Sequence, residues 1–300
     1  MMGSIARLSF TTRLLGTKSG LYRTMTMAAT DYQYENLKIT KPSEWVFHVE
    51  FNRPDKRNAI NRALSEDIVS SFKKLSYDPD CRVVVLSGAG RTFTSGIDFA
   101  SLAEVHQETG DMEVSRRAFA LHKAIKDFQE TCSSFEKCLK PVISAVHGAC
   151  IGFGVDLITA CDMRYCTKDA WFQVKEVDFG LAADVGTLQR LPRIIGNQSL
   201  VRELAYTARS ITSDEAHDAG LVSRVFDDKE QLMKAVLDTA SVIARKSPVA
   251  IQTTKKNLLY SQDHSVQDGL DNIAALNQVM LQSEDLMKSI AEKSPIFSKL

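Results

Sequence analysis

Three carboxylates in the middle of the chain, Asp156, Glu176 and Asp184, have the residue type and spacing for proton transfer. They lie in the longest apolar, glycine-punctuated stretch of the sequence, with no run of Lys or Arg beside them. Burying an ionised acid costs free energy unless the acid is paired. A single Asp or Glu is more often a helix cap or a solvated surface residue, but three acids kept in such a stretch favour a general acid/base site.

Two glycine-containing loops, 93–98 and 148–154, could supply backbone N–H groups to a ligand, because each follows a β-branched apolar run. Glycine lets the chain approach a ligand closely, and N–H groups at a helix start carry the positive end of the macrodipole. Glycines entering a helix are a weak signal alone, since tight packing explains most of them. Two such loops with Asp156 close by favour stabilisation of an enolate. The dinucleotide fingerprint and the P-loop are absent from the sequence, so no nucleotide cofactor is expected.

The elements that would position these residues alternate between strands and helices. Apolar β-branched or alternating runs predict strands, at 45–51, 83–86, 142–146 and 163–166. Helical periodicity predicts helices, at 62–77 after the N-cap Asn61 and at 113–135. This alternation places the fold in the α/β class.

Beyond Leu200 the strand signal fades and helices are expected, at 213–219, at 229–245, after Ser247-Pro248 and at 264–288. We therefore expect a core domain over 31–225 and a helical C-terminal region over 226–300. The apolar stripes of the C-terminal helices hint at a homo-oligomer, although packing within one chain would explain them equally well.

Composition excludes several classes of protein. With 300 residues and 44% apolar content the chain can bury a large core, and 37 basic against 37 acidic residues give zero formal charge, which disfavours nucleic acid as a partner. The six cysteines form no C-x-x-C pair and the six histidines have no paired-ligand spacing, so a reducing compartment and no metal are expected. No apolar run is long enough for a membrane span.

Both ends of the chain carry possible targeting signals. Residues 1–30 contain four basic and no acidic residues among Ser, Thr and apolar residues, the pattern of a mitochondrial transit peptide. Ser298-Lys299-Leu300 spells the peroxisomal signal that an import receptor reads. Peroxisome and mitochondrion are both expected.

Segments 52–59, 93–98 and 147–156 resemble the signature segments of the enoyl-CoA hydratase/isomerase (crotonase) superfamily, and the resemblance runs from about Tyr32 to the C-terminus. Segment 172–192 is most similar to the members of this family that isomerise dienoyl-CoA. The resemblance implies a crotonase-type spiral of ββα units, an acyl-CoA substrate, no cofactor apart from the CoA of that substrate, and a trimer or hexamer.

The resemblance also implies site residues. The N–H groups of Ser95 and Phe153 would form an oxyanion hole for the thioester oxygen, although the family usually has Gly where Phe153 stands and often Ala where Ser95 stands. The segment from the first loop into the residue after it would line the acyl-CoA site: Ser95, Gly96, Ile97, Asp98 and Phe99. Glu176 would be the base at C2 and Asp184 the acid at C6, with the reverse assignment open, while Asp156 would keep one acid protonated near neutral pH.

The implied reaction converts 3,5-dienoyl-CoA to 2,4-dienoyl-CoA in fatty-acid β-oxidation. The alternatives are an enoyl-CoA hydratase and a non-catalytic acyl-CoA- or RNA-binding member of the family. Asp156 and Asp184 count against a hydratase, because hydratases of the family have Glu at the first position and a small residue at the second. Asp98 is expected to act as a cap, and Asp162 and Asp178 to be structural. Basic residues that could contact CoA phosphates, but that are more often simply solvated, are Lys56, Arg57, Lys255 and Lys256.

Overall fold

A seven-stranded sheet organises the chain, whose computed structural model describes residues 27–28 and 32–300. In sheet order its strands are β1 (Met27–Ala28), β2 (Leu37–Ser43), β3 (Val46–Phe51), β4 (Val83–Gly88), β5 (Val142–Val146), β7 (Met163–Thr167) and β10 (Arg224–Phe226). Strands β1 to β3 pair antiparallel, and β3 to β10 pair parallel. A smaller sheet holds β6 (Ala149–Ile151), β8 (Trp171–Gln173) and β9 (Ser210–Thr212). Apart from residues 27 and 28, the predicted targeting segment 1–30 lies outside the described residues.

Helices follow most of the strands. They are η1 (Pro54–Lys56), α1 (Arg62–Tyr77), α2 (Phe99–Thr109), α3 (Val114–Lys137), α4 (Phe153–Thr159), η2 (Glu176–Phe179), α5 (Thr187–Ile194), α6 (Gln198–Thr207), α7 (Ser213–Asp218), α8 (Lys229–Ala244), α9 (Pro248–Tyr260), α10 (Val266–Met280) and α11 (Glu284–Ala291). The predicted cap of α1 is confirmed, because the Asn61 side chain accepts a hydrogen bond of 2.9 Å from the Leu64 N–H.

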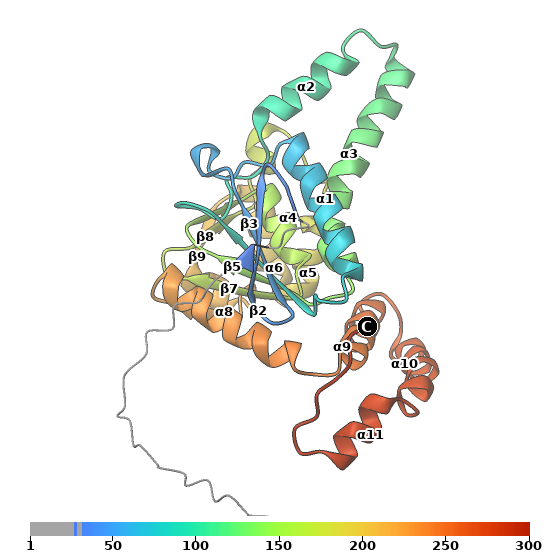
Figure 1. Cartoon of the computed structure of the whole chain (residues 1–300). Helices are drawn as coiled ribbons and strands as arrows, with labels where there is room; N and C mark the ends of the chain where they lie inside the picture. The colour runs from blue at the N-terminus through green and yellow to red at the C-terminus, as the bar shows by residue number, and fades with distance from the viewer. Residues whose placement is uncertain (1–26, 29–31) are drawn as a thin grey trace, which may run out of the picture.

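Both faces of the large sheet are covered, which explains the continuous apolar strands. Helix α8 buries Leu232 and Val236 against one face, together with Val85 of β4. Helices α1, α3 and α4 pack on the other face, where the rings of Phe72 and Phe135 lie 4.4 Å apart. Figure 1 shows α8 beneath the sheet and α1 with α3 along its side. The predicted α/β class is confirmed, and α8 packs on the core sheet although it lies in the C-terminal region 226–300.

Beyond Leu200 the structure differs from the sequence-based expectation in two ways. The single helix expected over 264–288 is wrong: α10 ends at Met280, and α11 begins after Ser283, whose hydroxyl accepts from the Leu286 N–H at 3.2 Å. The short strands β9 and β10 were not expected. Helices α9 to α11 lie to one side of the core (Figure 1), and none of the helices described is long and apolar enough to cross a membrane.

The end of the chain returns to the start of β4. Arg82 donates hydrogen bonds to the carbonyl oxygens of Ala244 at 2.9 Å and Phe297 at 2.7 Å, and its guanidinium lies 3.6 Å from the ring centre of Trp45. Lys299, from the predicted peroxisomal signal, forms an ion pair with Asp80. The last residues are therefore held against the surface of the core.

Candidate active site

Asp156 lies in the first turn of α4, a helix that starts at a glycine turn. Gly152 has φ +49° and donates its N–H to the Gln173 carbonyl at 2.8 Å, so that β6 leads directly into the helix. A Cβ atom at Gly154 would lie 2.5 Å from Cγ2 of Thr94, which shows how closely the helix start approaches the loop 93–98. The side chain of Asp156 is fully buried there.

The two glycine loops meet in the structure as the sequence predicts. The Thr94 N–H donates to the Ala149 carbonyl at 3.1 Å, which ties the first loop to β6. Gly96 has φ +93°, and a Cβ there would lie 2.7 Å from the Ile151 oxygen and 3.7 Å from the Phe153 nitrogen. Only glycine allows this close approach, so Gly96 fixes the spacing between the two loops.

Ser95 cannot be an oxyanion donor, which corrects the expectation from the sequence. Its N–H donates to the Arg57 carbonyl at 3.0 Å, and the neighbouring N–H groups of Gly96 and Asp98 donate to Thr94 Oγ1 and the Ile60 carbonyl. Within residues 32–300, the N–H groups of Ile97 and Phe153 at this junction have no acceptor. Both amides can therefore donate to a ligand.

The Phe153 ring does not enter the space in front of these amides. Its side chain is buried in the main apolar cluster, and its ring packs edge-on against Phe128 of α3 with 5.8 Å between the centres. The bulky side chain at a position where Gly is usual is therefore accommodated inside the core.

The three carboxylates are close enough to influence one another. Burial raises the pKa of Asp156 to about 7, with further contributions from the negative charges of Glu176 and Asp184. One Asp156 oxygen accepts from the Thr187 N–H, and the other is buried without a partner among the described residues. A carboxyl in this setting holds its proton near neutral pH.

Glu176, at the start of η2, is half-buried and reaches back over the start of α4. Its Oε1 would lie 3.2 Å from a Cβ at Gly152, and its Oε2 is buried without a partner in the described part of the chain. Burial raises its pKa, and the charge of Asp184 adds to this. Asp184 is more exposed, yet partial burial raises its pKa as well, and its carbonyl accepts a 2.7 Å hydrogen bond from Gln129 of α3.

Asp98 has the structural role that the sequence indicates. Its side chain accepts from the Ala100 N–H at 3.2 Å, capping α2, and pairs with Arg53 at 3.2 Å. Phe99 follows it, half-exposed, with its ring 4.8 Å from that of Phe179. This exposed aromatic pair lies between the loop 93–98 and the turn that carries Glu176.

Lys255 is not available to a CoA phosphate. Its ammonium is buried and donates to the carbonyls of Phe135 and Lys140, both at 3.1 Å, and to Asp162 Oδ2 at 2.8 Å. Asp162 also accepts from the Val142 N–H at 2.7 Å, so both are structural. Asp178 pairs with Lys175.

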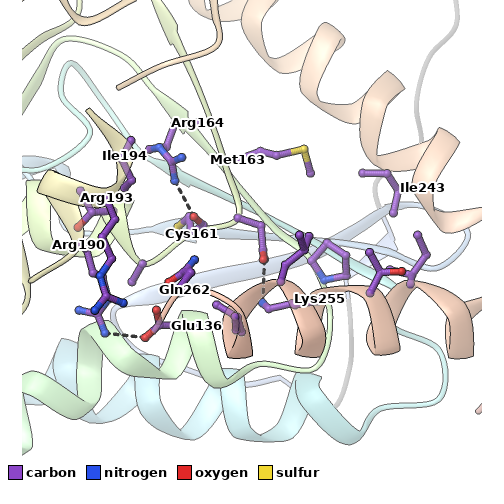
Figure 2. A pocket seen from close by; sticks show the side chains of 18 residues that line it. Glu136, Cys161, Met163, Arg164, Arg190, Arg193, Ile194, Ile243, Lys255 and Gln262 are labelled. Atoms are coloured by element: carbon purple, nitrogen blue, oxygen red, sulfur yellow. Dashed lines mark hydrogen bonds and ion pairs between the residues drawn. The ribbon is translucent and has the colours of Figure 1, made fainter. Parts of the chain in front are cut away.

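A cavity of about 540 Å³ lies between α9 and the end of the sheet, and Lys255 lines it (Figure 2). Apolar side chains from β7, α5 and α9 form much of its wall, and none of the three carboxylates belongs to it. Within the described residues, no cluster of His, Cys, Asp or Glu could hold a metal ion. The polar groups suited to chemistry are thus gathered around Asp156.

Comparison with known proteins identifies the family. The enoyl-CoA hydratase/isomerase family matches residues 41–296. Proteins named Δ(3,5)-Δ(2,4)-dienoyl-CoA isomerase are similar to the chain: the mitochondrial one of Homo sapiens is 55% identical over 91% of the chain and 85% of its own length, and the peroxisomal one of Arabidopsis thaliana is 44% identical over 89% and 98%. The crystal structure of an enoyl-CoA hydratase from Bacillus anthracis superposes with a TM-score of 0.79 at 25% identity, covering 88% of this chain and 99% of the other. This chain belongs to the enoyl-CoA hydratase/isomerase family.

Proposed function

We propose that the chain isomerises 3,5-dienoyl-CoA to 2,4-dienoyl-CoA in fatty-acid β-oxidation. The observation that carries the proposal is the set of three coupled carboxylates beside two unpartnered amides. The names of relatives that are 44–56% identical to the chain support it. The reaction moves protons and double bonds at constant oxidation level, so the proposal requires no cofactor besides the CoA of the substrate.

In the proposed mechanism, the Ile97 and Phe153 N–H groups bind the thioester oxygen. Glu176 removes a proton from C2, the negative charge spreads along the conjugated chain to the thioester oxygen, and a donor amide stabilises it by about 3 kcal/mol. Asp184, which starts protonated, then delivers its proton to C6, which leaves double bonds at C2 and C4. Asp156 also remains protonated, so that of the three carboxyls Glu176 alone is ionised before the reaction.

Spectrophotometry separates this function from its alternatives. The purified protein should raise the absorbance of the 2,4-dienoyl thioester when it is mixed with 3,5-dienoyl-CoA. A hydratase would instead consume 2-enoyl-CoA, and a non-catalytic acyl-CoA- or RNA-binding protein would change neither signal. Either of those results would reject the proposal.

We also infer that the chain forms a homo-oligomer, a trimer or hexamer, through its C-terminal helices. Large apolar side chains there are half or more exposed in the single chain: Leu258, Val266, Leu270, Val279, Met287 and Ile290. Exposed apolar surface of this kind favours a partner. Light scattering should give a mass of three or six chains, and a monomer would contradict the inference.

The relatives are named mitochondrial in mammals and peroxisomal in Arabidopsis thaliana. We infer that this chain works in one or both compartments, with the peroxisomal import receptor as a partner through Ser298-Lys299-Leu300. Imaging of cells that express fluorescent fusions at either end tests this, because a C-terminal fusion would cover that tripeptide. An unchanged peroxisomal signal with the tripeptide covered would contradict the role of the receptor.

A further inference from the structure

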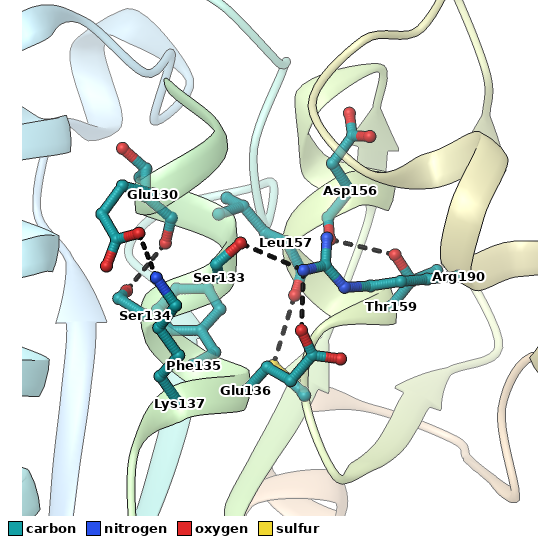
Figure 3. Close-up of polar contacts among 12 residues, drawn as sticks. Glu130, Ser133, Ser134, Phe135, Glu136, Lys137, Asp156, Leu157, Thr159 and Arg190 are labelled. Atoms are coloured by element: carbon teal, nitrogen blue, oxygen red, sulfur yellow. Dashed lines mark hydrogen bonds and ion pairs between the residues drawn. The ribbon is translucent and has the colours of Figure 1, made fainter. Parts of the chain in front are cut away.

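Helix α3 contacts several of the segments that form the candidate active site. Phe128 packs against Phe153, which carries one of the unpartnered amides. Gln129 Nε2 donates to the Asp184 carbonyl at 2.7 Å. Two more residues of α3 bind Arg190, whose guanidinium lies 3.1 Å from Ser133 Oγ and 2.8 Å from Glu136 Oε2 (Figure 3).

The contact with Arg190 extends to Asp156 through the start of α5. Gly186, just before α5, has φ +143°, and a Cβ there would lie 2.0 Å from Arg190 Nη1. The next residue, Thr187, donates its N–H to Asp156. Because α3 holds Arg190 and Arg190 fills the space beneath Gly186, the C-terminal end of the segment 180–186 is fixed by packing.

The middle of the same segment depends on Gln129. Asp184 lies between η2 and α5, outside regular secondary structure, with Ala183 and Val185 buried on either side of it. The Gln129 amide is itself oriented, because its Oε1 accepts a hydrogen bond from Lys126 Nζ at 2.8 Å. An oriented amide that binds the backbone of one residue restrains where the side chain of that residue points.

We propose that Gln129 is a positioning residue for the isomerisation: its hydrogen bond to the Asp184 carbonyl holds the Asp184 carboxyl where it can protonate C6. This inference rests on the proposed function. Gln129 itself does not touch the reacting atoms. Small errors in the placement of a catalytic group cost large factors in rate, so loss of this bond should slow the proton transfer by Asp184 and spare the step by Glu176.

The test replaces Gln129 by Met, which keeps the length of the side chain and removes the donor. With 3,5-dienoyl-CoA in D₂O, kcat for isomerisation should fall roughly tenfold while KM stays within about twofold. Incorporation of deuterium at C2 of the remaining substrate should continue at the wild-type rate, so the ratio of exchange to isomerisation should rise roughly tenfold. A merely structural role would lower both rates together and leave the ratio unchanged, and that result would overturn the inference.

Two further variants complete the design. Gln198→Met removes a similar bond, from Nε2 to the Pro192 carbonyl at 2.8 Å, at the exposed start of α6, and should behave as wild type. Lys126→Met leaves Gln129 in place but frees its amide, so the ratio should rise in the same direction by a smaller factor. If Gln129→Met does not fold, an unchanged ratio in Lys126→Met overturns the inference. Absence of isomerisation by the wild-type protein would instead reject the proposed function.

Discussion

Replacing Asp156 by Asn should stabilise the protein above pH 7 and change its stability little near pH 4. Burial and neighbouring acids raise the pKa of Asp156 from 3.8 to about 7. In the unfolded chain the carboxyl ionises near pH 4, whereas in the folded chain it keeps its proton until about pH 7. Wild-type stability therefore falls as pH rises between these two values. The Asn side chain does not ionise, so the variant does not show this loss.

The size of the effect follows from the shift. A rise in pKa from 3.8 to about 7 corresponds to on the order of 4 kcal/mol of destabilisation at pH 8. The Asn oxygen can still accept from the Thr187 N–H, and the atom in the place of Oδ2 is unpartnered in both proteins. The contribution of these contacts to the stability difference between variant and wild type is therefore the same at every pH. At about 2 °C per kcal/mol, the melting temperature of Asp156→Asn relative to wild type should be about 8 °C higher at pH 8 than at pH 4.

Thermal melting of wild type and variant at pH 4, 6 and 8 measures this difference directly. Asp111→Asn, at an exposed residue, is the matched control, and its melting temperature should follow wild type throughout. If the gap between Asp156→Asn and wild type is the same at every pH, Asp156 is ionised in the folded protein and the reasoning about its burial is wrong.

Three further predictions concern the site and its support. Asp184→Asn should lower the isomerisation rate by about 100-fold or more while leaving acyl-CoA affinity within a few-fold, measured by calorimetry and absorbance; near-normal turnover would remove Asp184 from the mechanism. Gly96→Ala should abolish activity, because the new Cβ would meet the Ile151 oxygen at 2.7 Å and separate the two amides, and an active variant with a native circular dichroism spectrum would contradict this. Lys255→Met should destabilise the fold by about 3 kcal/mol, since it leaves the Asp162 carboxylate without its cation, and urea unfolding at equal pH should detect it; unchanged stability would show that this ion pair is dispensable.

The strands that the sequence predicted correctly have continuous or alternating apolar runs, whereas β2, with seven residues, was missed because its only large apolar residues are Leu37 and Ile39. Val142 to Val146 is a strand with the predicted bounds, because an unbroken β-branched run reflects burial on both faces. Strands β9 and β10 have three residues each, too few for any periodicity. The break between α10 and α11 had a local signal, the capping residue Ser283 followed by two acids, but the apolar pattern continues across it.

Contacts between distant segments account for the errors at the site. The sequence places Ser95 in the correct loop, yet which amide of that loop stays free depends on the carbonyls of Arg57 and Ile60. Neither contact can be predicted from residue type, because every residue has a backbone carbonyl. Lys255 was misjudged for a related reason: its burial depends on carbonyls from another part of the chain. The role inferred for Gln129 rests on one more backbone acceptor of this kind.

The buried acids link stability to activity through one physical cause. Removing water from Asp156 destabilises its ionised form, and the same burial leaves a proton on it while Glu176 can ionise and act as a base. An Asn at this position would keep the shape and the hydrogen bond from Thr187, and it would avoid the loss of stability at high pH. In the proposed mechanism Asp156 transfers no proton, so a neutral side chain at this position is sufficient. Asp156→Asn should therefore be the more stable protein at pH 8 and keep an isomerisation rate within a few-fold of wild type, and a large loss of rate would show that the proton of Asp156 takes part in the reaction.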